Sequence, residues 1–256
     1  MTTNIMKKKG QVTIFVIIAI VIVALAVLIY FLYPKIKSSV SSSDNPYEVL
    51  RSCLQEDLVK ASEELSLRGG SINPEHYIVY NGENIEYLCY TNEFYKTCVM
   101  QQPMLKDHVE KEIELETRNK VKECFSSVEE TFKKKGYTVN LKSGGTEVEL
   151  LPKRVVMRFN HTLTLTKGET KNYDKFSVVL NNNLYELISI ANSILNFEAR
   201  YGDSETTAYM NYYKDLKVEK KNQLDGSTIY ILTDRNTQNK FQFASRSVAW
   251  PPGYGA

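Results

Sequence analysis

The longest apolar run of the sequence extends from Val12 to Leu32, 21 positions without a charged residue. Only Thr13 and Tyr30 carry a polar group in this run. As a helix it would be about 32 Å long, enough to cross a hydrocarbon core of about 30 Å. A core helix of this length normally keeps a polar face, and a cleaved secretory signal has an apolar stretch of only about 7–15 residues. The pattern therefore predicts one transmembrane helix over residues 11–33.

After this run the hydrophobic pattern becomes amphipathic. A Ser-rich stretch at residues 34–45 predicts a linker, and residues 46–136 predict a helix-hairpin-helix region. Leucines spaced by three and four from Leu50 to Leu65 indicate the first helix, and the stretch 103–135 indicates the second. Between them, Asn81-Gly82 separates two strand-like runs and predicts a hairpin.

Residues 137–249 alternate between strand-like and helical periods. Turn glycines at Gly144-Gly145 and Asp225-Gly226 predict hairpins, and residues 181–201 show an apolar helical stripe that Gly202 ends. Residues 250–256 predict a flexible tail or a docking end. The expected fold class is α+β, with one N-terminal transmembrane helix followed by an extracytoplasmic domain of antiparallel hairpins and amphipathic helices.

Charge around the apolar run predicts its orientation. Residues 1–10 form a basic tail with Lys7, Lys8 and Lys9 and no acid, which favours a cytoplasmic N-terminus and an extracytoplasmic C-terminal domain. The chain has 32 basic and 30 acidic residues. Without these three lysines, the rest of the chain has 29 basic and 30 acidic residues and is therefore close to neutral. We therefore expect the lipid bilayer as a partner and no nucleic acid.

The four cysteines are Cys53, Cys89, Cys98 and Cys124. An even number beyond a membrane anchor predicts disulfides in an oxidising space, and the absence of a C-x-x-C pair argues against zinc. Among three possible connectivities we favour Cys89–Cys98, on runs that flank a turn, and Cys53–Cys124, between two helices. Free buried cysteines are the alternative.

The N-terminal segment Lys-Lys-Lys-Gly-Gln-Val-Thr-Ile-Phe at residues 7–15 resembles the class III signal peptides of archaeal type IV pilin-like proteins. The resemblance implies cleavage between Gly10 and Gln11 by a prepilin-type peptidase, with residues 1–10 as the leader. It also implies other envelope or pilin-like proteins as partners. Phe15 departs from the pattern, because many pilins carry glutamate there. The rest of the chain resembles uncharacterised archaeal surface proteins.

Candidate chemistry is sparse along the chain. The histidines His76, His108 and His161 show no spacing typical of a metal site, and no nucleotide-binding or nucleophile motif occurs. Acid pairs such as Glu110/Glu114 alternate with lysines and indicate a solvated helix face. We therefore predict no catalytic residues, no metal ligands and no cofactor.

Two surface features stand out. Asn160 begins an Asn-His-Thr sequence, a possible glycosylation site if it lies outside the cytoplasm. Tyrosines cluster around the first predicted hairpin and again at residues 209–213, and such rings are typical both of contact surfaces and of half-buried strands.

These features favour a membrane-anchored cell-surface protein with a non-enzymatic structural, adhesive or assembly role. The alternative is a membrane-tethered extracytoplasmic enzyme, or a receptor for a solute or polymer, with a site made of residues scattered along the sequence.

Overall fold

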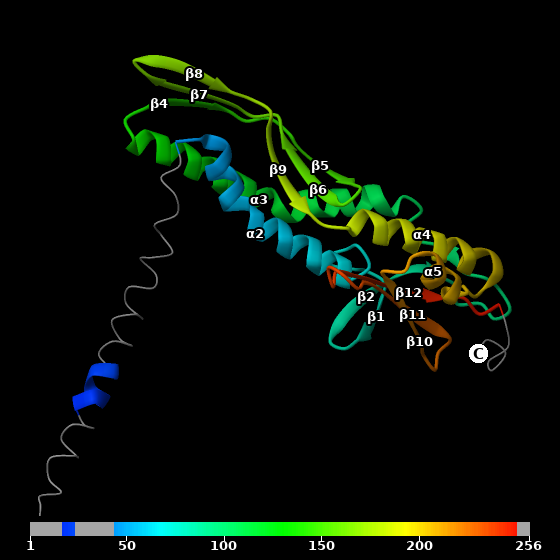
Figure 1. Cartoon of the computed structure of the whole chain (residues 1–256). Helices are drawn as coiled ribbons and strands as arrows, with labels where there is room; N and C mark the ends of the chain where they lie inside the picture. Colours follow the sequence, from blue (N-terminus) through cyan, green and yellow to red (C-terminus); the bar gives the residue numbers. More distant parts are fainter. Residues whose placement is uncertain (1–16, 24–43, 250–256) are drawn as a thin grey trace, which may run out of the picture. The chain divides into compact units, whose positions relative to one another are not determined.

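The computed structural model describes residues 17–23 and 44–249 and divides the chain into two units, Met1–Asp44 and Asn45–Ala256 (Figure 1). In the first unit, residues 17–23 are helical and their side chains are exposed. The leader 1–10, the cleavage position Gly10-Gln11, most of the linker 34–45 and the segment 250–256 lie outside the described residues. The resemblance to class III signal peptides therefore stays a prediction.

The predicted transmembrane helix at residues 11–33 is not supported. In the ranges 17–23 and 44–249, no helix combines the length and the apolar character needed to cross a membrane. Of the predicted span, the structure describes residues 17–23, which are helical. The predicted transmembrane architecture and the single-pass location in the cell membrane are corrected accordingly.

The second unit has the mixed α+β composition that the hydrophobic pattern indicates. Its elements, in chain order, are α2 (Pro46–Leu67), β1 (Tyr77–Tyr80), β2 (Glu83–Tyr90), β3 (Val99–Met100), α3 (Leu105–Lys134), β4 (Thr138–Lys142), β5 (Thr146–Leu151), β6 (Arg154–Phe159), β7 (Thr162–Lys167), β8 (Glu169–Tyr173), β9 (Phe176–Asn181), α4 (Leu184–Tyr201), α5 (Thr206–Tyr212), β10 (Leu216–Asn222), β11 (Ser227–Asp234) and β12 (Lys240–Arg246).

Helices α2 and α3 pack against each other, as their apolar stripes require. The Asn45 side chain caps α2 by accepting from the amide of Tyr47 at 3.1 Å, and Pro46 occupies the first turn. Leu50, Leu54 and the following leucines of the stripe are almost fully buried. A disulfide between Cys53 and Cys124 joins the two helices.

Strands β4 to β9 form one bent antiparallel ribbon over these helices (Figure 1). Two three-stranded sheets, β4-β7-β8 and β5-β6-β9, meet end to end where residues 143–145 and 160–161 interrupt the strands. At this bend the amide of Asn160 donates to the carbonyl of Gly145 at 2.9 Å. A Cβ on Gly144 would lie 1.8 Å from the carbonyl oxygen of Asn160. The close approach therefore requires glycine at position 144.

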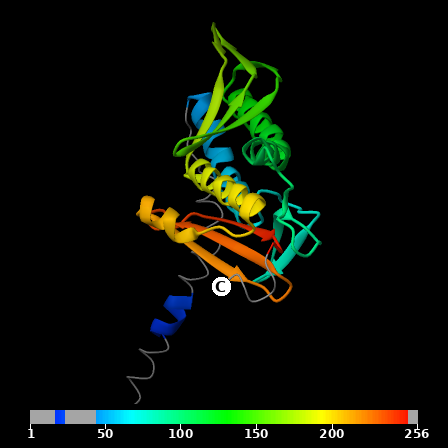
Figure 2. The same ribbon diagram turned by 90° about the vertical axis from the view of Figure 1, so that its right-hand side faces the viewer.

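The third and largest sheet has the order β1-β2-β12-β11-β10, with β3 also paired to β2. Every pairing is antiparallel except β2 with β12, which is parallel. Helix α4 packs on this sheet at β11 and β12 (Figure 2). Gly202 ends α4 in the left-handed conformation with φ +82°. The sequence predicts the hairpins of this sheet but not the parallel pairing.

The two disulfides of the structure are Cys53–Cys124 and Cys89–Cys98, which are the pairings that the sequence favoured. The prediction that the chain contains disulfides is thereby confirmed. One apolar core runs through α2, α3, α4 and all three sheets, and it includes Cys89, Cys98 and Cys124. A smaller cluster with Ile85 and Tyr87 lies apart from it.

Candidate functional site

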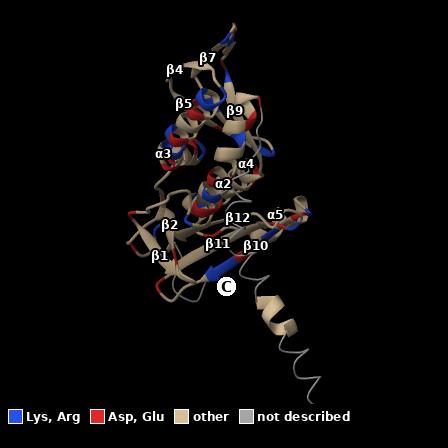
Figure 3. Cartoon of the chain, turned by 90° about the vertical axis from the view of Figure 1, so that its left-hand side faces the viewer, with Lys and Arg blue, Asp and Glu red and all other residues tan. Residues whose placement is uncertain are grey.

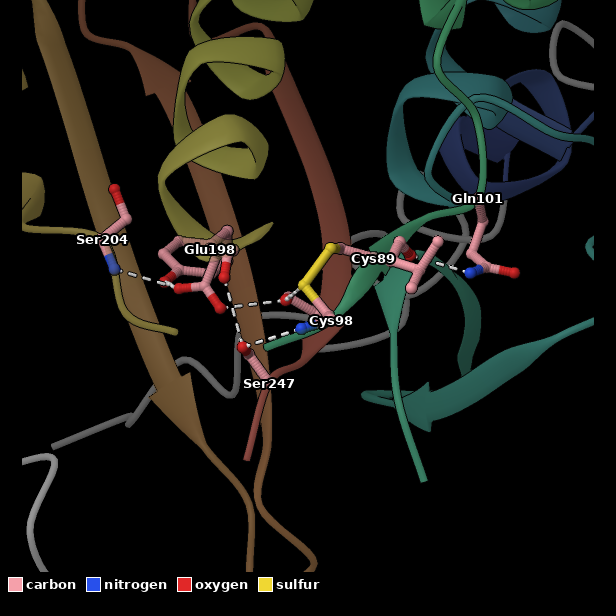
Figure 4. The surroundings of a disulfide bond; sticks show 9 residues. Cys89, Cys98, Gln101, Glu198, Ser204 and Ser247 are labelled. Carbon is pink, nitrogen blue, oxygen red and sulfur yellow. Dashed lines mark hydrogen bonds between the residues drawn. A yellow bond between two sulfur atoms is a disulfide. The ribbon is translucent and has the colours of Figure 1, made fainter. Parts of the chain in front are cut away.

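A buried carboxylate lies near the end of α4. Glu198 is only 2% exposed, and its carboxylate accepts a hydrogen bond from the hydroxyl of Tyr230 (Figure 4). It also accepts from the backbone amide of Ser204 at 3.1 Å and from the hydroxyl of Ser245 at 3.0 Å. Each oxygen of this carboxylate therefore has protein donors from elements distant in the sequence.

The carboxylate cluster continues to the Cys89–Cys98 disulfide (Figure 4). The Ser245 hydroxyl lies 3.6 Å from the sulfur of Cys98. The Ser247 hydroxyl donates to the backbone carbonyl of Glu198 at 3.2 Å and accepts from the amide of Cys98 at 3.1 Å. The cluster thus ties α4, β12 and the disulfide loop together.

Burial controls the charges in and beside this cluster. Loss of solvation raises the pKa of the Glu198 carboxyl, which the hydrogen bonds from Tyr230 and Ser245 only partly oppose. Burial lowers the pKa of Lys220, whose amine pairs with Asp203 and lies 5.9 Å from the centre of the Tyr230 ring. Because Glu198 is fully enclosed and bonded to protein groups, the cluster has the character of a structural tie and presents no group to a substrate.

A second polar cluster brings together a serine, a histidine and a glutamate. The hydroxyl of Ser71 donates to Glu86 at 2.5 Å and lies 2.8 Å from Nε2 of His108. A serine nucleophile gives its proton to histidine, which the acid orients from the other ring nitrogen. Here Ser71 lies between the other two groups, so the acid bonds to the serine instead of orienting the histidine.

The order of these three groups is therefore not that of a catalytic triad. Ser71 is 6% exposed and Glu86 is 8% exposed, and burial raises the pKa of Glu86. The sequence placed His108 on a charged helix and did not identify either partner. Gly70 is the local feature of the sequence that points to this cluster. A Cβ at Gly70 would lie 2.8 Å from Val109 and would hold the Ser71 loop away from α3.

The remaining candidate residues are not brought together. His161 is buried and stacks on Phe125 at 4.0 Å, and burial lowers its pKa. His76 lies 4.8 Å from the ring of Tyr87. Asn160 is exposed in the break between β6 and β7, and its glycosylation stays a prediction. In the described ranges, no group of three or more histidine, cysteine, aspartate and glutamate side chains is arranged to hold a metal ion.

An aromatic groove lies between α4 and α5. Its volume is about 370 Å³, and Ser193 and Phe197 of α4 face Ala208, Tyr209, Tyr212 and Tyr213 of the α5 region across it. The hydroxyls of Ser193 and Tyr209 lie 2.8 Å apart and hold the two walls together. Tyr212 is 79% exposed and Phe197 is 46% exposed. We call this feature the α4–α5 groove; its tyrosines are those that cluster at residues 209–213 of the sequence.

The two edges of the larger sheet differ in chemistry. Strand β1 (Tyr77–Tyr80) carries no charge, and Val79 is 64% exposed. Strand β10 (Leu216–Asn222) carries three lysines and a glutamate (Figure 3), and α5 contacts it. Charged side chains on an edge strand hinder pairing with another chain, whereas an apolar edge permits it.

The backbone of β1 presents free hydrogen-bonding groups. The carbonyl of His76 accepts from the amide of Tyr87, so the backbone groups of His76 point toward β2. Ile78 and Tyr80, two and four residues later, point toward β2 in the same way. In an antiparallel ladder the alternate residues direct their N–H and C=O groups outward, which here are Tyr77 and Val79. Outside the β1–β2 ladder, neither makes a backbone hydrogen bond within the described residues.

No protein-family model, curated protein or solved structure matches this chain.

Proposed function

We propose that this chain is a non-enzymatic assembly protein that pairs with a second copy of itself through strand β1. The observation that carries the proposal is the uncharged outer edge of Tyr77–Tyr80, with its unpaired backbone groups at Tyr77 and Val79. An exposed strand edge offers main-chain hydrogen bonds for affinity and alternate side chains for specificity.

The side chains of β1 are complementary to themselves. If two copies pair antiparallel about Ile78, Tyr77 lies opposite Val79 of the second copy, and Val79 lies opposite Tyr77 of that copy. Each pair exchanges two backbone hydrogen bonds and joins an aromatic to a β-branched side chain, a favourable cross-strand combination. No like charges meet across the four positions, and a two-fold contact of this kind closes without forming a fibre.

The polar clusters do not favour the enzyme alternative. Ser71 and Glu198 are buried, and their hydrogen bonds go to protein groups. The receptor alternative has a candidate surface in the α4–α5 groove, which is independent of β1.

The proposal is tested by the molar mass of the full chain, measured by light scattering during size-exclusion chromatography. We expect a dimer for the wild type and a monomer for Val79→Lys, because the two lysines place like charges on either side of the central Ile78. Val179→Lys is the matched control, since Val179 is an exposed valine on β9 in the other sheet. A monomeric wild type, or a Val79→Lys variant that stays dimeric, would contradict the proposal.

A further inference from the structure

We propose that residues 250–256 of this chain bind in its own α4–α5 groove. The inference concerns a site separate from β1 and stands whether or not the chain dimerises. It rests on where the described chain leaves the fold, on the reach of seven residues and on the chemistry of the two surfaces.

The described chain ends beside the groove. Ala249 packs against the end of α4, where a Cβ on Gly202 would lie 2.3 Å from the Cβ of Ala249. Two residues earlier, the Ser247 hydroxyl is bonded to the carbonyl of Glu198. Phe197, on the wall of the groove, precedes Gly202 by little more than one helical turn. The segment after Ala249 therefore starts at the end of the groove formed by the last turns of α4.

The length of the segment matches the groove. From Gly202 back to Ser193, the first residue of α4 that lines the groove, the helix rises about 14 Å. Seven residues that include two prolines span about 22 Å at the rise of an extended proline-rich chain. Residues 250–256 can thus reach the whole groove without any movement of α4 or α5.

The chemistry of the segment suits the groove. Its sequence, Trp-Pro-Pro-Gly-Tyr-Gly-Ala, has no charged side chain and contains adjacent prolines between aromatic residues. Grooves lined with aromatic side chains bind proline-rich segments because prolines lose little conformational entropy on binding. The one acid on the wall, Glu205, is already engaged at the start of α5, where it accepts from the amide of Thr207 at 2.7 Å. The groove thereby offers rings and hydroxyls to an uncharged aromatic ligand.

Trp250 provides a direct reporter, because it is the only tryptophan in the sequence. The experiment measures acrylamide quenching of its fluorescence in the full chain. We expect Trp250 to be protected in the wild type. Tyr212→Ser should lower the ratio of docked to undocked segment about tenfold and raise the quenching constant toward that of a free tryptophan peptide. Val179→Ser, in the other sheet, should leave the quenching unchanged.

A second variant keeps the groove intact. Replacing Pro251 and Pro252 with glycine changes no residue of the folded unit that the structure describes, and it should also raise the quenching constant by restoring freedom to the unbound segment. Protection that is independent of protein concentration supports binding within one chain. Full quenching of the wild type would overturn the proposal, as would protection that appears only at high concentration or that survives both the Tyr212 and the proline changes.

Discussion

Two halves of the folded unit share one apolar core but differ in what else they bury. The helical half consists of α2, α3 and the bent ribbon β4–β9, and the sheet half consists of β1–β3, β10–β12, α4 and α5. Leucines, valines and phenylalanines fill the helical half, and its disulfide joins cysteines 71 positions apart. The sheet half encloses the Glu198 carboxylate beside a disulfide of separation 9.

The difference shows that each half depends on a different kind of constraint. In the helical half, a disulfide between residues far apart in the sequence and close steric fit hold apolar surfaces together. In the sheet half, hydrogen bonds from Tyr230, Ser245 and Ser204 organise the meeting point of α4 with the sheet. Such a network is stable only while all its members are satisfied.

The largest effect is expected from the helical disulfide. Replacing Cys53 and Cys124 with alanine should lower the free energy of unfolding by about 4 kcal/mol, because the link closes a long loop in the unfolded chain. The same change at Cys89 and Cys98 should cost only about 2.5 kcal/mol, since that loop is short. Urea denaturation of both double variants under non-reducing conditions measures the two values. Equal losses of unfolding free energy, or a larger loss for the Cys89 and Cys98 variant, would contradict this difference between the two halves.

The steric fit at the bend of the ribbon gives the next effect. Gly144→Ala places a methyl group against the carbonyl oxygen of Asn160, so β4–β5 must move away from β6–β7 at a cost of about 3 kcal/mol. Gly145→Ala is the matched control in the same turn, since a Cβ there meets nothing within 4 Å. Its cost should stay within about 0.5 kcal/mol. Thermal unfolding of the two variants would show similar losses if the bend could adjust freely.

The smallest effect is expected from Glu198 and the pH. Its pKa is raised in the folded state, so the folded chain holds the proton more tightly than the unfolded chain does. This contribution to stability is fully present below the ordinary pKa of 4.5 and is lost as the pH rises through the raised pKa.

Glu198→Gln removes that dependence because the amide does not titrate. The difference in unfolding free energy between wild type and Glu198→Gln should therefore shift in favour of the variant as the pH rises above 4.5. Glu130→Gln, on an exposed face of α3, is the control for a general effect of charge. A difference that stays constant with pH would show that Glu198 does not titrate in this range.

Much of the local structure could be predicted from the sequence. The leucine stripe of α2, the Asn81-Gly82 hairpin and the Gly202 stop of α4 depend on residues close in the chain, and the structure places each as expected. The apolar run Val12–Leu32 predicts a membrane helix over residues 11–33, and in the described residues no helix has the length and apolar character to cross a membrane.

The groups that define the candidate sites depend on distant residues. Glu198 looks like one more polar residue of a helix until Tyr230 and Ser245 reach it from β11 and β12. Likewise, no local pattern pairs Ser71 with Glu86 and His108, because loop, strand and helix bring them together only in the fold. The tyrosines of the α4–α5 groove form a cluster in the sequence, but the sequence does not show that they line a groove with α4.

The parallel pairing of β2 with β12 has a consequence for synthesis on the ribosome. Tyr87 pairs with Ala244, which is translated roughly 150 residues later. At about 5–20 residues per second, β2 waits on the order of ten to thirty seconds for its neighbour. During that interval the short Cys89–Cys98 loop can already close and pin β3 to β2. An oxidant supplied early would thus fix β3 on β2 before β12 is made.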